Sequence, residues 1–326
     1  MREPIYLIVN PAAGGGRGRK MRRRVEDALG GRGVRFQVRE TQARGQASEL
    51  AQRALDAGAG AIYAVGGDGT AHEVANGILA SGSPAEELPA LGIVPVGTGN
   101  DFARMLGVTR HSPLDALDPA PARVFDVGRL DWDGGSEYFI NGSGTGIDVE
   151  VVRQIERLPR MPGIASYLIG VLRALAHYRP TPVRIRIDGE EVDRKVMIVA
   201  VMNGSRQAGG FHVCPGARPD DGRIDLCVVD ELGIVESLRV LPRVLKGTHA
   251  NEPAITLARA SCVEIESLST TPLFFQVDGE LRTPERTRWL RFQVQPQSLR
   301  VLPASATAPE DNMSPEASTR TVDRLE

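Results

Sequence analysis

The sequence predicts an α/β protein of two domains, in which a doubly wound parallel sheet is followed by a mostly antiparallel β-sandwich. Residues 1 to about 110 alternate short apolar runs with stretches of helical spacing, and this alternation is typical of parallel βαβ units. After Pro119-Ala-Pro121, strand candidates follow one another with turn residues between them, which favours an antiparallel sandwich. A chain of 326 residues is also longer than one ordinary core accommodates.

The first domain contains four strand candidates, each followed by a helical segment. We expect the strands at 5–9, 34–39, 61–65 and 91–96, and the helices from about residue 18 and at 47–56, 71–79 and 102–106. Three of these strands end in glycine-rich segments. Open parallel sheets bind their ligands at the carboxyl ends of the strands, so these segments are candidates for a binding site.

The second domain contains eight strand candidates and two helical segments. We expect the strands at 124–130, 138–141, 183–187, 195–202, 223–229, 261–267, 273–277 and 290–294. The helices are expected at 148–176, with breaks at Pro159 and Pro162, and at 234–246. The domains are accordingly expected at 1–128 and 129–296. The chain from Pro303 onward is rich in Pro, Ser, Ala, Thr and acids, so we expect a disordered tail, with 305–326 outside both domains.

The composition excludes several classes of protein. A formal net charge of -2 argues against a dedicated nucleic-acid binder. Three cysteines and five scattered histidines support neither a disulfide framework nor a zinc site. The apolar runs Ile5–Val9 and Ile164–Ala176 are too short for a signal peptide or a membrane span. We therefore expect a cytoplasmic chain without a transmembrane segment.

The sharpest motif is Gly66-Gly67-Asp68-Gly69-Thr70, at the end of the third strand. Its glycines allow positive φ and close approach of a ligand to the backbone, and the following helix offers free N–H groups to an anion. A carboxylate such as Asp68 is useful there with a divalent cation or a hydroxyl partner. The alternative is a tight turn in which Asp68 and Thr70 only cap the helix.

Two further segments favour a phosphate site over a simple turn. Gly97-Thr98-Gly99-Asn100-Asp101 follows the fourth strand, and Asn10-Pro11 with Gly14-Gly15-Gly16 follows the first. Three such strand ends in one parallel sheet converge on one edge, which indicates a site for nucleotide phosphates. The Walker A and Gly-x-Gly-x-x-Gly patterns are both absent from the sequence, so a P-loop enzyme and a standard dinucleotide binder are excluded.

These motifs together with Asp278-Gly279-Glu280 resemble the diacylglycerol kinase catalytic family. The chain is most similar to its soluble bacterial lipid kinases, which are relatives of sphingosine and ceramide kinases. The resemblance covers residues 4 to 302. It implies a first domain like those of NAD kinase and phosphofructokinase, a β-sandwich as the second, substrates in the cleft between them, and a last strand at 297–304 that returns to the first domain.

The resemblance also implies ATP as co-substrate, with Mg²⁺. The residues that it assigns to ATP are Asn10, Pro11, Gly14, Gly15, Gly16, Thr41, Gly66, Gly67, Asp68, Gly69, Thr70, Gly97, Thr98, Gly99 and Asn100. It places Asp68, Asp101 and Asp126 in an acidic, hydrated network with magnesium, which suits phosphoryl transfer because metal ions neutralise much of the charge. Taken alone, Asp101 is equally explained as a carboxylate at a helix N-terminus.

Two acidic segments of the second domain have both a structural and a functional interpretation. Asp278-Gly279 is ordinarily a hairpin turn; the resemblance makes Asp278 the general base for the lipid hydroxyl, with Glu280 as the second candidate, two residues further on the same strand face. The turn at 219–225 is also typical of a hairpin. There the resemblance implies a structural magnesium held by Asp220, the carbonyl of Arg223 and Asp225, with Asp221 as an alternative to Asp220, and oxygen donors suit that ion.

A lipid substrate requires contact with a membrane surface, and two segments are candidates for it. The basic run Arg17–Arg24 is either a solvated helix face or a site for ATP phosphates or anionic head groups. Ile164–Ala176 is either an acyl-chain passage or an ordinary core helix. We therefore expect a peripheral contact with the inner face of the membrane and no nucleic-acid partner. Members of the family often form homodimers, but the sequence does not determine the oligomeric state.

Two rival functions follow from the same motifs. An NAD kinase-like phosphotransferase shares the Gly66–Thr70 loop, and a non-catalytic lipid- or nucleotide-binding module would share the fold. The second is disfavoured because every expected carboxylate is present. The acceptor, whether diacylglycerol, another lipid alcohol or a sphingoid base, is not determined by the sequence.

Overall fold

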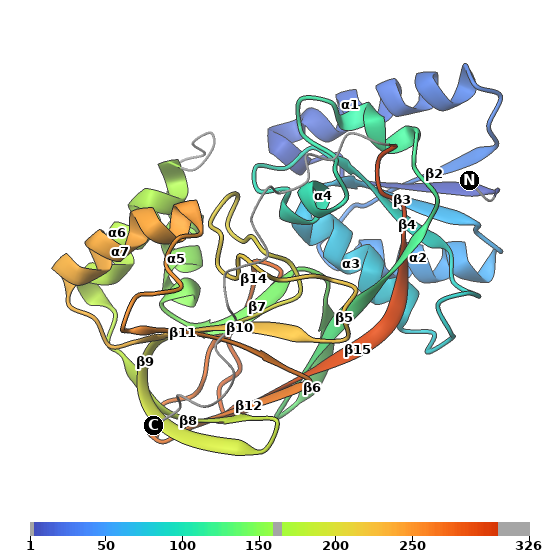
Figure 1. The fold of residues 1–326 in the computed structure, drawn as a ribbon. Helices are drawn as coiled ribbons and strands as arrows, with labels where there is room; N and C mark the ends of the chain where they lie inside the picture. Colours follow the sequence, from blue (N-terminus) through green and yellow to red (C-terminus); the bar gives the residue numbers. More distant parts are fainter. Residues whose placement is uncertain (1–2, 159–164, 306–326) are drawn as a thin grey trace. The chain divides into compact units, whose positions relative to one another are not determined.

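The computed structural model describes residues 3–158 and 165–305, and the chain forms two compact units. Among the described residues, one unit contains the chain up to Asp126 together with residues 297–305, and the other contains Val127–Pro296. The chain passes from one unit into the other within β5 (Arg123–Trp132) and again within β15 (Trp289–Val301) (Figure 1). Residues 306–326 of the predicted tail lie outside the described residues, as do the predicted helix breaks at Pro159 and Pro162.

The first unit is built on a parallel sheet, as the alternation of strands and helices predicts. The strand order is β2-β1-β3-β4-β15, and the pairs β1–β2, β1–β3, β3–β4 and β4–β15 are all parallel. The strands are β1 (Ile5–Val9), β2 (Phe36–Glu40), β3 (Ala61–Gly66) and β4 (Ala90–Pro95). Every residue of β1, β3 and β4 is buried, which explains why these strands are continuous apolar runs without alternation.

Helices cover both faces of this sheet (Figure 1). They are α1 (Ala13–Gly30), α2 (Gln46–Asp56), α3 (Asp68–Leu79), α4 (Asp101–Met105) and the 3-10 helix η1 (Pro113–Leu117). In α2, the buried residues Ala47, Leu50, Ala51 and Ala54 have the spacing of one helix face. That face packs on α3, where Gly77 leaves room for the backbone of α2.

The second unit is mostly antiparallel and β-sandwich-like, so the predicted fold class is confirmed. Its strands, besides the ends of β5 and β15, are β6 (Gly135–Phe139), β7 (Gly142–Gly146), β8 (Thr181–Ile187), β9 (Glu190–Met202), β10 (Ile224–Asp230), β11 (Ile255–Ala260), β12 (Cys262–Ser267), β13 (Phe275–Val277) and β14 (Glu280–Arg282). The long β9 is central: its first half pairs with β8, and its second half pairs with β7 on one side and β10 on the other.

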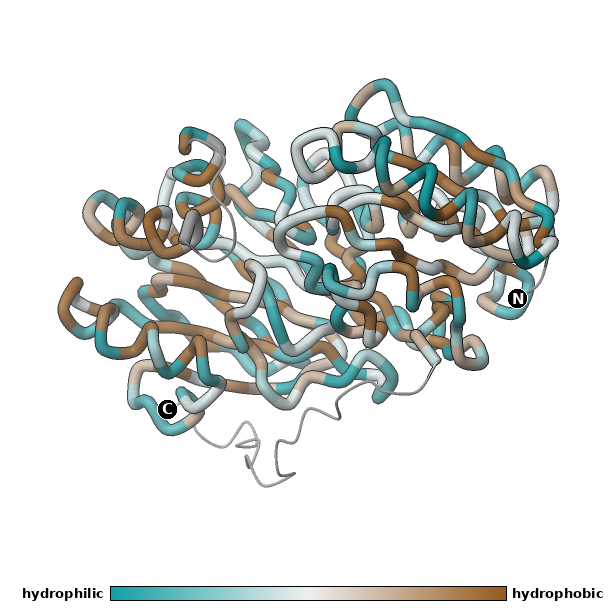
Figure 2. The backbone as a smooth tube through the Cα atoms, turned by 90° about the horizontal axis from the view of Figure 1, so that it is seen from above, coloured by the Kyte–Doolittle hydropathy of each residue, from teal (hydrophilic) through white to brown (hydrophobic). Residues whose placement is uncertain are grey.

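Inward-facing side chains of these strands form one continuous core. Aromatic side chains contribute to it, with ring centroids 5.1 Å apart for Trp132 and Phe275 and 6.3 Å apart for Phe139 and Phe292. Figure 2 shows the strands as largely hydrophobic stretches and the connecting turns as largely hydrophilic. A second cluster of buried side chains lies under the helix α7 (Ile234–Lys246).

Three strands of this unit are missing from the prediction: β7, β11 and β14. The sequence of β7 is Gly-Ser-Gly-Thr-Gly, which has a low strand propensity. Its glycines are required because a Cβ on Gly142 or Gly144 would collide with β9. The predicted strand at 290–294 and the predicted returning strand at 297–304 are in fact one strand, β15, which ends at Val301.

The remaining helices are α5 (Ile147–Glu156) and α6 (Ala165–His177), which pack against each other. Gly170 of α6 lies in close contact with Val151 and Ile155 of α5. Within residues 3–158 and 165–305, no helix has the length and apolarity that crossing a membrane requires.

The chain just beyond β15 is part of the first unit, so the expectation that the tail begins at Pro303 is wrong. The carbonyl of Pro303 accepts a hydrogen bond of 2.9 Å from the Ala120 N–H. Ala304 and Ser305 donate their N–H groups to the carbonyls of Leu106 (2.8 Å) and Asp118 (2.9 Å).

Candidate functional site

The three glycine-rich segments of the first unit meet at the edge of the sheet where β1, β3 and β4 end. Backbone hydrogen bonds join them: Asn10 N–H donates to the Val65 carbonyl (3.0 Å), and Val96 N–H donates to the Gly66 carbonyl (2.7 Å). The Asn10 side chain donates through Nδ2 to Thr70 Oγ1 at 3.3 Å. Thr41, at the end of β2, joins the same edge through its N–H bond to the Val9 carbonyl (2.9 Å).

Glycine is required at this edge for two different reasons. A Cβ on Gly97 would lie 2.8 Å from the Cα of Gly67, so the two backbones approach too closely for any side chain. Gly14, Gly15 and Gly16 have φ angles of 59°, 74° and 93° and interrupt the first turn of α1. A Cβ built on Gly15 or Gly16 would meet no atom of the described chain within 4 Å. The backbone of this loop is therefore open to a ligand.

Arg17 fixes the glycine loop to the end of β4. Its guanidinium donates to the carbonyl of Gly14 (2.8 Å) and to that of Val96 (3.1 Å). Further along α1, Arg22 pairs with Glu26 (2.7 Å) and Glu40 (2.9 Å). The predicted basic run thus includes two residues with structural partners, and its other four basic side chains, Arg19, Lys20, Arg23 and Arg24, are exposed.

Asp68 positions the loop after β4. Its Oδ2 accepts the Asn100 N–H at 2.6 Å, and its Oδ1 accepts the Phe102 N–H at 3.2 Å. The carboxylate therefore satisfies free N–H groups at the start of α4, which makes it a cap for α4 rather than for its own helix. Gly99 must lack a side chain because a Cβ there would lie 2.7 Å from Asp68 Oδ2.

Asn100 is held in a left-handed conformation (φ 56°) with its side chain turned inward. Its Nδ2 donates to the Gly97 carbonyl at 2.9 Å. Its Oδ1 is buried and has no hydrogen-bond partner among the described residues. A buried acceptor without a partner is costly, so this oxygen fits a donor or a cation supplied with a ligand.

Asp101 and Asp126 are both buried, and each has a protein partner. Asp101 forms an ion pair of 3.0 Å with Arg104. Asp126 Oδ1 accepts the N–H of Gln297 at 2.8 Å and so binds the segment where β15 re-enters this unit. Nowhere in the described ranges do three or more His, Cys, Asp or Glu side chains form a group that could hold a metal ion. A magnesium at this edge would need oxygens from its substrate, which is the usual arrangement for this ion.

In the second unit, Asp278 and Gly279 form the turn of the hairpin β13–β14. Val277 pairs with Glu280, and the two turn residues have φ angles of 48° and 86°, as a two-residue type I′ turn requires. Asp278 and Glu280 therefore do not share a strand face, and the expectation that they do is wrong. Glu280 is the first residue of β14 and is half-buried.

The Asp278 carboxylate accepts three backbone hydrogen bonds. Oδ2 accepts the N–H of Ile140 (3.0 Å), and Oδ1 accepts those of Asn141 (2.9 Å) and Gly142 (3.0 Å). A carboxylate offers about four acceptor positions, so at most one is left for a substrate. These bonds fix the carboxylate against the start of β7.

Two functional candidates, Gln276 and Asp148, were not predicted from the sequence. The buried Gln276 accepts the Gly279 N–H through Oε1 (2.8 Å) and donates through Nε2 to Asp148 Oδ2 (3.3 Å). Asp148 Oδ1 is buried and has no hydrogen-bond partner in the described parts of the chain. Burial raises the pKa of Asp148 to about 6. The signal was present, since Asp148 follows a glycine-rich strand and lies in the first turn of a helix, as Asp68 does.

The predicted metal loop at 219–225 ends the long connection between β9 and β10 and is not a hairpin turn. Asp225 Oδ1 accepts a bond of 3.2 Å from Arg259 Nε, and its buried Oδ2 has no hydrogen-bond partner within residues 3–158 and 165–305. Burial raises the pKa of Asp225 to about 6, although Arg259 opposes the shift. Asp220 pairs with Arg218 at 3.5 Å. The Asp225 oxygen without a partner is of the kind that a hard cation prefers, but the Arg259 guanidinium already places a positive charge beside this carboxylate.

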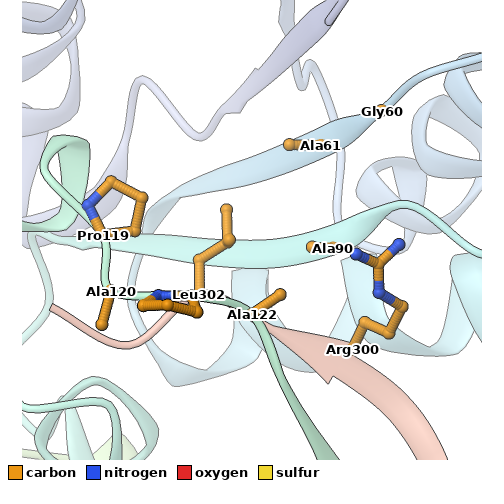
Figure 3. A pocket seen from close by; sticks show the side chains of 9 residues that line it. Gly60, Ala61, Ala90, Pro119, Ala120, Ala122, Arg300 and Leu302 are labelled. Atoms are coloured by element: carbon orange, nitrogen blue, oxygen red, sulfur yellow. The ribbon is translucent and has the colours of Figure 1, made fainter. Parts of the chain in front are cut away.

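A separate pocket of about 480 Å³ lies at the opposite edge of the parallel sheet (Figure 3). Ala61 and Ala90, which begin β3 and β4, line it together with Pro119, Arg300 and Leu302. Its lining is largely apolar, and the Arg300 guanidinium is bound to the carbonyl of Leu88 (3.1 Å). This pocket contains none of the glycine-rich segments.

Comparison with known proteins supports the same interpretation of the two units. Residues 4–130 match the diacylglycerol kinase catalytic domain, and residues 143–303 match the YegS C-terminal NAD kinase beta sandwich-like domain. The chain is 32% identical over 279 residues to the diacylglycerol kinase of Bacillus subtilis (strain 168), which covers 84% of this chain and 88% of that one. The protein belongs to the family of diacylglycerol kinases and YegS-like lipid kinases.

Other members of this lipid kinase family are similar over much of the chain. A probable lipid kinase YegS-like protein of Chromohalobacter salexigens is 34% identical over 253 residues, with 76% of this chain and 78% of that chain covered. A crystal structure of a diacylglycerol kinase from Bacillus anthracis str. Sterne has the same fold, with a TM-score of 0.66 at 23% identity over 92% of this chain and 96% of that chain. The resemblance drawn from the motifs is thus confirmed.

Proposed function

We propose that this lipid kinase transfers the γ-phosphate of ATP to the hydroxyl group of a lipid, diacylglycerol or a similar alcohol. Nucleotide binding is supported most strongly by the convergence of three glycine-rich strand ends on one sheet edge, where hydrogen bonds of Asn10, Gly66 and Val96 join them. The open backbone at Gly15 and the N-terminus of α3 would supply N–H groups for phosphate oxygens. The Gly16 N–H donates to the Ala12 carbonyl (3.1 Å), and the N–H groups of Asn100 and Phe102 donate to Asp68.

The nucleotide would be bound by three kinds of group. Backbone N–H groups within Gly14–Gly16 and Gly66–Thr70 would bind the phosphates, except those of Gly16 and Thr70, which donate to the carbonyls of Ala12 and Gly67. The Asn10 and Thr70 side chains are already linked to each other and would hold the loops after β1 and β3 in register. Asp68 would act as a positioning residue because its two bonds to the 100–102 backbone fix the loop after β4. Thr41 and Thr98 complete the proposed set.

Magnesium fits the donor atoms of both units. At the sheet edge, Asn100 Oδ1 and the Asp68 and Asp101 carboxylates are the oxygens near the proposed phosphates, and in the second unit Asp220, the Arg223 carbonyl and Asp225 would hold a structural ion. When bound, the ion at the phosphates neutralises charge during transfer. Asp126 is better explained as a residue that holds Gln297 in place.

The acceptor hydroxyl must lose its proton, and the second unit offers carboxylates for this step. Asp278 is fixed by three N–H groups and has at most one acceptor position left, and Glu280 begins β14 and is half-buried. Asp148, tied to the same turn by Gln276, is a third carboxyl in this region. We keep Asp278 and Glu280 as the two candidates for the general base.

The experiment is phosphoryl transfer to diacylglycerol in mixed micelles, with magnesium and with excess EDTA, for the wild type and for Asp278→Asn and Glu280→Gln. We expect turnover to require magnesium, and loss of at least about hundredfold in kcat in the variant that lacks the base. ATP binding by each variant, measured by calorimetry, controls for misfolding. Full turnover in EDTA, or full turnover in both variants, would contradict the proposal.

A further inference from the structure

The helix α7 exposes large apolar side chains that the core does not use. Ile234, Val235 and Leu238 are 54%, 61% and 40% exposed. All three lie in the first two turns of a helix with no fully buried residue. Exposed apolar clusters of this kind mark surfaces that bind a protein or a membrane.

The apolar residues of α7 form two separate faces. Val240 and Val244 pack on the buried cluster below the helix and explain why α7 is attached to the sheet. A second stripe, Ile234, Leu238, Leu241 and Leu245, has the spacing of one helix face, since its members are four, three and four residues apart. Ile234 and Leu238 are exposed, and Leu241 and Leu245 are half-buried. At 100° per residue this stripe points about a quarter-turn or more away from the face formed by Val240 and Val244.

Basic residues flank the second stripe on one side. Arg239, Arg243 and Lys246 are exposed and follow Val235 around the helix, and Glu236 is the only acid in α7. Arg243 is paired with Glu252. An apolar stripe bordered by cations is the pattern of a helix that lies in the plane of a bilayer interface and attracts anionic lipid.

The neighbouring helix adds to this surface. α6 packs beside α7, and its Leu172 is 51% exposed. Arg173 and His177 of the same helix are also exposed. Both helices belong to the second unit, which also carries the candidate residues for the lipid acceptor.

We propose that the surface formed by the second stripe of α7, Val235 and Leu172 docks the second unit on a bilayer that contains anionic lipid. The inference rests on the proposed function, because an enzyme whose acceptor lies in a bilayer must reach the bilayer surface. The cations favour a lipid occupant over a second copy of this chain, which would present the same positive charge to itself. Insertion would be shallow, with the apolar stripe among the head groups and the cations beside the phosphates.

Vesicle co-sedimentation tests the surface directly. The vesicles are phosphatidylcholine alone and phosphatidylcholine mixed with phosphatidylglycerol. Arg239→Gln/Lys246→Gln should weaken binding to the anionic vesicles by about twentyfold, since each cation near the surface contributes about fivefold. Val235→Ser/Leu238→Ser should weaken binding to them at least about tenfold. The matched control is Leu268→Ser, since Leu268 is 42% exposed and lies outside α7, and it should bind like the wild type.

Two further readouts separate the possible outcomes. Turnover on a short-chain, monomeric lipid alcohol should be unchanged in all variants. If the wild type phosphorylates no lipid, the proposed function is refuted, and the vesicle binding of the variants still tests whether the α7 surface docks on a bilayer. Analytical ultracentrifugation tests whether the α7 surface instead binds a second copy of this chain. A wild-type dimer that Leu238→Ser converts to a monomer, with vesicle binding intact, would overturn the proposal. The proposal would also be overturned if the α7 variants weakened vesicle binding no more than Leu268→Ser does.

Discussion

Burial of the Asp148 carboxyl should destabilise the native state at neutral pH, and Asp148→Asn should remove that penalty. Only one of its oxygens has a partner, Gln276 Nε2 at 3.3 Å, and the other is buried without one in the described chain. Burial is the largest cause of the rise in its pKa to about 6. An asparagine has the same shape, and its Oδ1 still accepts from Gln276.

The size of the effect follows from linkage. An aspartate with a pKa near 3.9 when unfolded and about 6 when folded binds its proton more tightly in the native state. The tighter proton binding stabilises the native state, and this stabilisation is complete below about pH 4 and is lost as the pH rises through about 6. A difference of about two pH units corresponds to about 3 kcal/mol. Because the unfolded carboxyl is already about half ionised at pH 4, the wild type should lose about 2 kcal/mol of this relative to Asp148→Asn between about pH 4 and about pH 7.

The assay is urea unfolding of both proteins over this pH range, followed by a probe of the second unit such as Trp132 fluorescence. We expect the difference in free energy of unfolding to be small at the acid end and to favour the variant at neutral pH. Glu150→Gln, on the same helix, controls for the loss of a carboxylate from α5. A constant difference across the range, or a variant less stable at neutral pH, would refute the reasoning.

Three other perturbations test the glycine-rich edge and the end of the chain. Asp68→Ala leaves the N–H groups of Asn100 and Phe102 without acceptors, so it should cost about 2 to 4 kcal/mol in thermal unfolding and about hundredfold in turnover. Asp68→Asn retains one acceptor oxygen for the two donors, so it should cost less stability than Asp68→Ala does. Equal melting temperatures for the two variants would contradict this. Gly97→Ala places a Cβ 2.8 Å from Gly67 Cα, so it should weaken ATP binding and destabilise the first unit by about 1 to 3 kcal/mol, and wild-type affinity would refute the close approach. Truncation after Leu302 removes three backbone hydrogen bonds and should lower the melting temperature by several degrees, while truncation after Ser305 should not; identical melting curves would show that these bonds contribute nothing.

The fold could be predicted where one physical cause dominated the sequence. β1, β3 and β4 are buried on both faces, and continuous apolar runs identify such strands to within a residue or two. β7 could not be found because its strand conformation depends on close packing between β9 and β13, which selects glycine rather than a strand-forming residue. The short β14 exists only as the second arm of the Asp278-Gly279 hairpin.

The candidate site was predictable as a set of loops but not as a set of contacts. Strand order brought Asn10, Gly66 and Gly97 to one edge, as parallel topology requires. Sequence could not show that Asp68 holds the backbone of the next loop or that three N–H groups hold Asp278, because those donors lie 32 to 138 residues away along the chain. Asp148 was missed because its environment depends on Gln276, a neighbour only in the folded structure.

The most direct test of the account is transfer of label from γ-labelled ATP, with magnesium, to a panel of lipid alcohols in mixed micelles, with NAD as a parallel acceptor. We predict label on a lipid and none on NAD, with loss of the signal in Asp68→Ala. Label on NAD alone would contradict the account and identify the protein as an NAD kinase-like phosphotransferase. No label on any acceptor, in a protein that still binds ATP, would contradict it as well and favour a binding module on the same fold.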